Sequence, residues 1–282
     1  IKYWKEVERS LRRDVCPALG NRPAAEIARS EIASIHRRLT RAGKPVQANR
    51  MHAYVRRLYN WGIRQDKVTH NPADGIERNK EVPKERVLSD VEMREFMGAM
   101  SESGFSASLM NVYRLILYLG LRPGEVVSLS ESMIDESSQV IRLERTKNDR
   151  VHVVPISTQA RAVIDAQLRE GKCLFPSDSD PTRPLRVDTL SKRLRQYREQ
   201  IGIDTITPHD LRRTFATGLA RTNAPRLIIS LALNHSVPGV TSTYDRHGYE
   251  NELRTAIQKW GDYIDAICDP AGKIHLLSAQ HG

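Results

Sequence analysis

The sequence predicts a mainly α fold with one small antiparallel β-sheet, divided between two domains. Apolar residues recur at helical spacing along most of the chain, and only 140–144 and 151–156 have strand character. A charged stretch that contains a proline and lacks an apolar period separates the first third from the rest. At 282 residues, 39% of them apolar, the chain is long enough for two cores. The expected parts are a helical domain at 1–80, a linker at 81–88, a second domain at 89–268 and a tail at 269–282.

Two helices are predicted in the first domain, separated by a break at Gly43-Lys44-Pro45. The first carries Ile27, Ile32, Ile35 and Leu39 on one face, and the second runs from about Gln47 to Arg64. The apolar stripe of the second helix comprises Met51, Tyr54, Val55 and Leu58 and extends to Trp61 and Ile63 at its end.

The positive charge is unevenly distributed. Residues 1–85 contain 19 Lys+Arg and 10 Asp+Glu, a net charge of +9, so only +1 of the total of +10 belongs to the rest of the chain. This asymmetry favours a nucleic-acid partner over a uniformly basic surface. A solvated basic face without a ligand is the alternative.

Several classes of protein are excluded. Three cysteines lie far apart without a CxxC, which excludes a disulfide framework, argues against a zinc finger and indicates a reducing, intracellular compartment. No apolar run approaches the roughly 18 residues that span a membrane, and there is no signal-peptide pattern. No Walker loop, HExxH or acidic cluster with metal-ligand spacing occurs. The first residue is Ile1 and not methionine, which indicates a fragment or a processed chain.

The second domain is predicted to hold helices around a short hairpin. Ser89 and Glu92 form a capping-box sequence, so a helix is expected from there to about Met100. The turn at 146–149 joins the two strands. The other expected helices lie at about 106–119, 158–170, 187–201, 208–222, 225–233 and 250–267.

Polar residues stand at four points where packing alone does not require them. Arg122 follows a helix that ends at Gly120, and Glu125 lies one turn into the next helix. Lys147 occupies the hairpin turn. Taken alone, the first pair fits a surface ion pair, and a turn lysine is usually solvated.

The other two points lie nearer the C-terminus. His209 and Arg212 share a face at the start of a helix, an end that attracts phosphate. His235 precedes Tyr244 by nine residues. Taken alone, these residues fit a capping histidine, a surface arginine, a structural histidine and a core tyrosine, and Tyr249 competes for the role of Tyr244.

Together, the order Arg, Lys, His-x-x-Arg, His, Tyr over about residues 86–265 resembles the tyrosine recombinase (phage integrase) family. The preceding helical region resembles the core-binding domain of that family. The segments around Leu233-Asn-His235 and Thr241-Ser-Thr-Tyr244 are similar to integrases of prophages and integrative elements. Many members have Gly where Asn234 stands. Similar integrases often carry an additional arm-site DNA-binding domain, and none is visible before Ile1.

The resemblance implies an α+β catalytic domain and a role for each matched residue. Five residues would surround the scissile phosphate, and Tyr244 would be the nucleophile. The five are Arg122, Lys147, His209, Arg212 and His235. Glu125 would support the first arginine, whereas Arg213 is outside the catalytic set of the family.

These residue types suit the implied chemistry. Guanidinium groups neutralise the charge that builds on the phosphate oxygens. A tyrosine with a pKa near 10 needs a base, for which His209 is favoured, while His235 would donate to a phosphate oxygen. Lys147 would protonate the leaving 5′-oxygen. No metal or other cofactor is implied.

The implied function is site-specific recombination of DNA by an integrase through a 3′-phosphotyrosine, for integration or excision of a mobile element. The implied partners are double-stranded attachment sites, three further copies in a tetramer assembled on DNA from monomers, and a DNA-bending accessory protein. The implied location is the bacterial cytoplasm, on the nucleoid when DNA is bound. The basic helices would contact DNA phosphates through Arg50, Arg56, Arg57 and Arg64.

Other readings remain open. A type IB topoisomerase shares this chemistry, and a catalytically silent DNA-binding regulator would keep the fold alone. A metal-dependent nuclease is disfavoured because carboxylates do not cluster. The last helix, with Leu253, Ile257, Trp260 and Ile264 at helical spacing, is expected to pack either on its own domain or on a neighbouring protomer.

Overall fold

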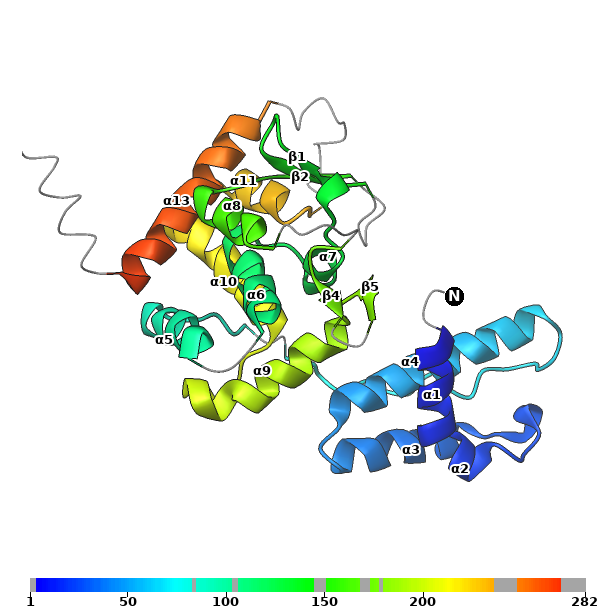
Figure 1. The fold of residues 1–282 in the computed structure, drawn as a ribbon. Coiled ribbons are helices and arrows are strands. Elements are labelled where there is room, and N and C mark those ends of the chain that lie inside the picture. Colours follow the sequence, from blue (N-terminus) through cyan, green and yellow to red (C-terminus); the bar gives the residue numbers. More distant parts are fainter. Residues whose placement is uncertain are drawn as a thin grey trace, which may run out of the picture. The chain divides into compact units, whose positions relative to one another are not determined.

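The structure is a computed structural model that contains two compact units, Ile1–Lys84 and Glu85–Gly282 (Figure 1). Lys147, Tyr244 and the expected C-terminal tail beyond residue 269 lie outside the described residues. In the described part of the chain, no helix is both long enough and apolar enough to cross a membrane. The described residues are 4–82, 85–102, 106–144, 151–167, 173–177, 180–235 and 248–269.

The first unit is helical, as predicted. Its longest helix, α4, packs against α3 and α1. Gly43 ends the preceding turn with a φ of +72°, and Pro45 occupies the first position of α4, where its missing N–H is not needed. The helices are α1 (Trp4–Asp14), α2 (Cys16–Leu19), α3 (Arg29–Arg41) and α4 (Pro45–Arg64), with a 3-10 turn at Ala24–Glu26.

The core of this unit corrects one prediction. Ile32, Ile35 and Met51 are buried as expected. Leu58, Trp61 and Ile63 are instead 48%, 46% and 37% exposed, so their assignment to the apolar stripe was wrong. The buried face of α4 continues from Val55 through Tyr59 and Gly62 at helical spacing, and a Cβ at Gly62 would lie 3.0 Å from the Val68 side chain. Leu58, Trp61 and Ile63 each stand one position before or after Tyr59 or Gly62, and so they lie beside the buried face.

The second unit confirms the mainly helical fold with small antiparallel sheets. One sheet has the strand order β1-β2-β3, and a second pairs β4 with β5, all antiparallel. The helices are α5 (Asp90–Glu102), α6 (Ala107–Leu119), α7 (Pro123–Val127), α8 (Thr158–Asp165), α9 (Val187–Ile201), α10 (Pro208–Arg221), α11 (Arg226–Ala232) and α13 (Glu250–Cys268). The strands are β1 (Ile134–Asp135), β2 (Val140–Leu143), β3 (His152–Pro155), β4 (Pro176–Ser177) and β5 (Asp180–Pro184).

Local sequence signals explain several of these boundaries. Ser89 and Glu92 bond reciprocally at the start of α5, at 2.9 Å from the Ser89 N–H to the Glu92 carboxylate and 3.3 Å in return, which confirms the capping box. Helix α8 ends at Asp165, earlier than the expected residue 170. Strand β1 and the pair of β4 with β5 were not predicted, because such short strands show no alternation.

Helix α6 is buried at nine of its thirteen positions and contacts α7, α8, α10 and α13. Helix α13 packs onto its own unit, and the Trp260 indole N–H donates to the Leu117 carbonyl of α6 at 2.8 Å. A Cβ at Gly218 of α10 would overlap the Trp260 ring. The buried contact of α10 with α6 fixes the relative position of the two elements that lead into the candidate site.

Candidate functional site

Gly120 sets the turn that carries Arg122. Its φ of +62° is a left-handed conformation that favours glycine, and it ends α6. A Cβ at this position would overlap the ring of Phe215 on α10. The turn after α6 is therefore pressed against α10, and Arg122 stands at the N-cap of α7 beside it.

Glu125 holds Arg122 in two ways. One carboxylate oxygen accepts the Arg122 backbone N–H at 2.8 Å, and the other accepts a guanidinium N–H at 2.7 Å. Both side chains are mostly buried, at 18% and 11% exposed. A charge-assisted pair shielded from water restricts the guanidinium far more than a surface ion pair does. Glu125 thus contacts Arg122, and its support of that arginine during the reaction stays a prediction.

Arg212 joins three segments of the unit. Its guanidinium donates to the Gly120 carbonyl at the end of α6 and, at 2.7 Å, to the Leu233 carbonyl at the end of α11. The Glu125 carboxylate lies 3.9 Å away. Because this side chain comes from the second turn of α10, it brings the ends of α6 and α11 close to the start of α10.

The electrostatics of the pair favour an anionic ligand. Burial, together with the positive charge of Arg122, lowers the pKa of Arg212 to about 10, and Glu125 only partly opposes this. Arg212 is still protonated at neutral pH. Two partly desolvated cations with one carboxylate between them leave net positive charge, which a phosphate group would neutralise.

His235 follows α11 and lies close enough to both arginines for their charges to act on it. Its pKa is lowered, first by burial and then by the charges of Arg212 and Arg122. This shift favours the neutral imidazole, a form that keeps one ring N–H as a donor. Asn234 supports this turn in a left-handed conformation, with a φ of +50°, where glycine also fits.

Of the remaining predicted site residues, the structure describes His209 but not Lys147 or Tyr244. His209 is exposed in the first turn of α10, three positions before Arg212. Lys147 and Tyr244 lie outside the described residues, so their positions stay predictions. Tyr249, the alternative nucleophile, is half-buried and packs against the core immediately before α13.

Replacing Glu125 by glutamine should lower the rate of the reaction at the arginine pair. The amide removes the charge that offsets the repulsion of Arg122 and Arg212, and it keeps the size of the side chain. A loss of roughly 10- to 100-fold is expected, because a guanidinium that shifts by about 1 Å loses alignment. DNA affinity should change little. If the site acts as the family resemblance implies, the rate is that of covalent protein–DNA adduct formation, and a rate equal to wild type would contradict this role.

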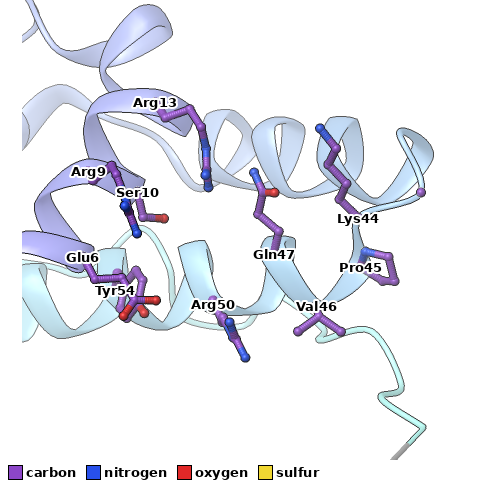
Figure 2. A pocket seen from close by; sticks show the side chains of 11 residues that line it. Glu6, Arg9, Ser10, Arg13, Lys44, Pro45, Val46, Gln47, Arg50 and Tyr54 are labelled. Atoms are coloured by element: carbon purple, nitrogen blue, oxygen red, sulfur yellow. The ribbon is translucent and has the colours of Figure 1, made fainter. Parts of the chain in front are cut away.

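A second cluster of cations lines a groove of the first unit, here called the basic groove. Figure 2 shows Arg9 and Arg13 on α1, and Lys44, Gln47 and Arg50 at the start of α4. The groove has a volume of about 420 Å³, and Glu6, Ser10 and Tyr54 also contribute to it. Arg13 bonds the buried Asp14 carboxylate at 2.7 Å, and Gln47 donates to the same carboxylate at 2.9 Å.

The four arginines predicted to contact DNA differ in their surroundings. Arg50 lies in the basic groove, and Arg57 and Arg64 follow it at intervals of two helical turns, all three exposed. Arg56 is instead bonded to the Asp74 carboxylate at 2.8 Å. Sequence reasoning missed Arg9, Arg13 and Lys44. The spacing of four between Arg9 and Arg13 was a signal that they share a helix face.

Solved structures share this fold. The lambda integrase (75–356) dimer bound to a COC′ core site superposes with a TM-score of 0.69 at 19% identity, covering 85% of this chain and 88% of that one. The Tn1549 transposon integrase (82–397) in complex with circular intermediate DNA gives 0.63 at 18% identity, covering 89% and 94%. The likeness to these structures shows that the chain has their fold.

The family follows from the sequence comparisons. The model of the phage integrase family matches residues 86–251, and that of the phage integrase central domain matches residues 1–79. This chain therefore belongs to the phage integrase family.

Two relatives show how far the similarity extends. Prophage integrase IntZ of Escherichia coli is 27% identical over 94% of this chain and 67% of that protein. Prophage integrase IntA of the same organism is 28% identical over 94% of this chain and 65% of that protein. The chain thus spans about two thirds of the length of these relatives.

Proposed function

We propose that this chain is a site-specific DNA recombinase that integrates or excises a mobile element through a 3′-phosphotyrosine intermediate. The observation that carries the proposal is the approach of Arg122 and Arg212, 90 residues apart in sequence, to the one carboxylate of Glu125, with His235 near enough for both positive charges to act on it. Positive charge at one point, with a neutral N–H donor beside it, suits a phosphodiester whose oxygens gain charge in the transition state.

In this mechanism the Tyr244 hydroxyl attacks phosphorus and its proton passes to His209. The two guanidiniums hold the non-bridging oxygens, and His235 donates to one of them. The bond to the 5′-oxygen breaks as Lys147 gives that oxygen a proton. Nucleophile and leaving group lie in line on opposite sides of phosphorus.

The intermediate keeps the energy of the phosphodiester in the new tyrosyl ester. The 5′-hydroxyl of another strand can therefore attack it and reseal the backbone without ATP. Tyr244 regains its proton when the strand is joined, so the cycle returns the enzyme unchanged.

The substrate proposed for this chemistry is a pair of double-stranded attachment sites. The lambda integrase has been solved as a tetramer bound to a Holliday junction, at a TM-score of 0.71 to this chain. We extend that arrangement to this chain as a tetramer on two duplexes, with a DNA-bending protein as a further partner. In each copy, residues 1–80 would grip the DNA backbone and residues 89–268 would cut it.

Binding of DNA phosphates by the basic groove should make the affinity for DNA depend measurably on the salt concentration. Replacing both Arg9 and Arg50 by glutamine should reduce the slope of log K against log salt by about 1.8, because each lost phosphate contact removes about 0.9. Binding of a fluorescent duplex of random sequence, titrated from low to moderate salt, measures this slope.

The control for that experiment is Arg12→Gln. Arg12 is on the same helix as Arg9 but outside the groove, and it is bonded to Glu8 at 2.9 Å. Its replacement should leave the slope within error of wild type. Equal slopes for all three proteins would exclude the basic groove as a DNA contact.

Covalent trapping tests the chemistry itself. A nicked duplex releases a short strand after cleavage, so that the protein cannot reseal the DNA and stays attached. The proposal predicts a covalent protein–DNA band in EDTA. A topoisomerase would also relax supercoiled plasmid without exchanging strands, and a silent regulator would shift the DNA without a covalent band.

A further inference from the structure

Asp14, the last residue of α1, is a buried carboxylate beside the basic groove. Its side chain is 4% exposed, whereas that of the neighbouring Arg13 is 55% exposed. The Arg13 guanidinium donates to both oxygens of this carboxylate, through Nε at 2.8 Å and through Nη2 at 2.7 Å. A bidentate pair of this kind fixes the plane of the guanidinium as well as its position.

Other side chains of the first unit hold Asp14 in its place. Gln47, in the first turn of α4, donates to the carboxylate at 2.9 Å, and Ser10 of α1 donates to it at 3.4 Å. Arg38 of α3 donates to the Asp14 backbone carbonyl at 3.1 Å. Because α1, α3 and α4 all contribute to these bonds, the carboxylate has a fixed position from which to orient Arg13.

The pair of Arg13 and Asp14 is ionic at neutral pH. The hydrogen bond from Arg13 lowers the pKa of Asp14 below its ordinary value, although burial acts in the opposite direction. The same bond raises the pKa of Arg13. The two charges cancel within the pair, so Arg13 supplies the basic groove with hydrogen-bond donors more than with net charge.

The Arg13 guanidinium keeps donors for a ligand on the side away from Asp14. Its two bonds to the carboxylate use two of its five N–H donors, which leaves three. Among the residues that the structure describes, Arg13 has no other hydrogen bond or ion pair. Figure 2 shows its side chain extending into the basic groove toward Gln47, so the remaining donors belong to the groove.

We propose that Asp14 is a positioning residue that holds Arg13 so that the free side of its guanidinium binds one backbone phosphate of DNA. This inference rests on the proposed function and assigns one residue of the basic groove a defined contact. The planar fork of a guanidinium matches a phosphate group. Because Asp14 has already ordered the side chain, its conformational freedom is lost when the chain folds and not when DNA binds.

Charge alone predicts the opposite effect of Asp14 on DNA binding. The carboxylate is negative, so its removal makes the surroundings of the groove more positive and should strengthen the binding of a polyanion. Positioning of Arg13 by Asp14 predicts that the same change weakens binding. The sign of the change in DNA affinity therefore separates the two accounts.

The first test needs no DNA. NMR measures how fast the Arg13 Nε–H exchanges its proton with water, and a hydrogen-bonded N–H exchanges slowly. In Asp14→Ala, which removes both acceptor oxygens, this exchange should accelerate at least about tenfold, because a hydrogen bond to a charged group is lost. The Nε–H of Arg12, which donates to Glu8 at 2.9 Å on the same helix, is the control and should exchange at its wild-type rate.

The second test measures binding of a fluorescent duplex of random sequence. Asp14→Ala and Arg13→Lys should each bind about 3- to 10-fold more weakly than wild type, because one long side chain must then be ordered on binding. Arg13→Lys keeps the charge and loses the bidentate pair, and it changes an exposed side chain, so the fold is retained. Arg12→Lys is the matched control outside the groove and should bind like wild type.

The double variant shows whether Asp14 acts through Arg13. Adding Asp14→Ala to Arg13→Lys should weaken DNA binding no further, whereas a general loss of structure would add its own effect. Unchanged exchange at Arg13 in Asp14→Ala, DNA binding by Asp14→Ala as tight as wild type or tighter, or additive losses would overturn the proposal. Failure of the wild-type chain to bind any duplex would overturn the proposed function, and the exchange rates would still decide whether Asp14 holds Arg13.

Discussion

Arg212→Lys should lower the rate of covalent adduct formation by about 10²- to 10³-fold, the loss typical of removing one preorganised donor from a transition-state site. Lysine keeps the positive charge. It presents a single ammonium, however, which cannot reach the carbonyls of Gly120 and Leu233 and still offer donors to a phosphate. Single-turnover cleavage of a nicked duplex measures the rate, and DNA affinity should fall much less than the rate.

The neighbouring arginine provides the matched control. Arg213 is on the same helix and is 42% exposed, with its guanidinium bonded to Asp210. Arg213→Lys should retain the wild-type rate. Equal losses in the two variants would mean that α10 matters only as a scaffold, and full activity in Arg212→Lys would remove Arg212 from the site.

Gly120→Ala should destabilise the second unit by about 3 kcal/mol. A side chain at a positive φ costs about 1 kcal/mol, and overpacking against a buried ring adds about 1–3 kcal/mol. Phe215 is fully buried in the core, and a Cβ at Gly120 would overlap its ring. The midpoint of thermal unfolding should fall by roughly 6–12 °C, since a unit of this size loses about 2–4 °C per kcal/mol.

Two further variants test whether overlap with Phe215 causes the loss of stability in Gly120→Ala. Gly124 lies in α7, where an added Cβ would meet only Val187 at an ordinary distance of 3.7 Å, so Gly124→Ala should keep or raise the melting midpoint. Adding Phe215→Leu to Gly120→Ala should recover part of the loss by making room. If Gly120→Ala has the same midpoint of thermal unfolding as wild type, the turn after α6 relaxes to accept the side chain and does not fix the position of Arg122.

Many of the candidate site residues could be predicted because their types and their order along the sequence are characteristic of the chemistry. Taken alone, Arg122 and Arg212 fit surface arginines, and only the order of all six residues, through its resemblance to the tyrosine recombinase family, implied that the two share one phosphate. Glycine at 120 indicated the end of α6. The convergence of Arg122 with Arg212 through Glu125 could not be derived from spacing, since it depends on how α6 and α10 pack.

Other features could not be predicted for reasons that are equally physical. Leu58 and Trp61 each stand next to a residue of the buried face of α4, and their apolar character alone did not show that the face runs through Tyr59 and Gly62. The basic groove needs two helices at once, so a count of arginines along α4 found Arg50 but not its neighbours on α1. In the sequence, Asn49 has no feature that distinguishes it from other polar residues of a helix. Its hydrogen bonds to Asn79 depend on the folding of a segment 30 residues away.

The most direct measurement of the proposed mechanism is covalent trapping on a pool of nicked duplexes in EDTA, compared among wild type, Tyr244→Phe and Tyr249→Phe. Wild type and Tyr249→Phe should form a protein–DNA adduct that survives denaturation and disappears on protease treatment, and Tyr244→Phe should form none. An adduct that persists in Tyr244→Phe, vanishes in Tyr249→Phe or requires magnesium would contradict the mechanism.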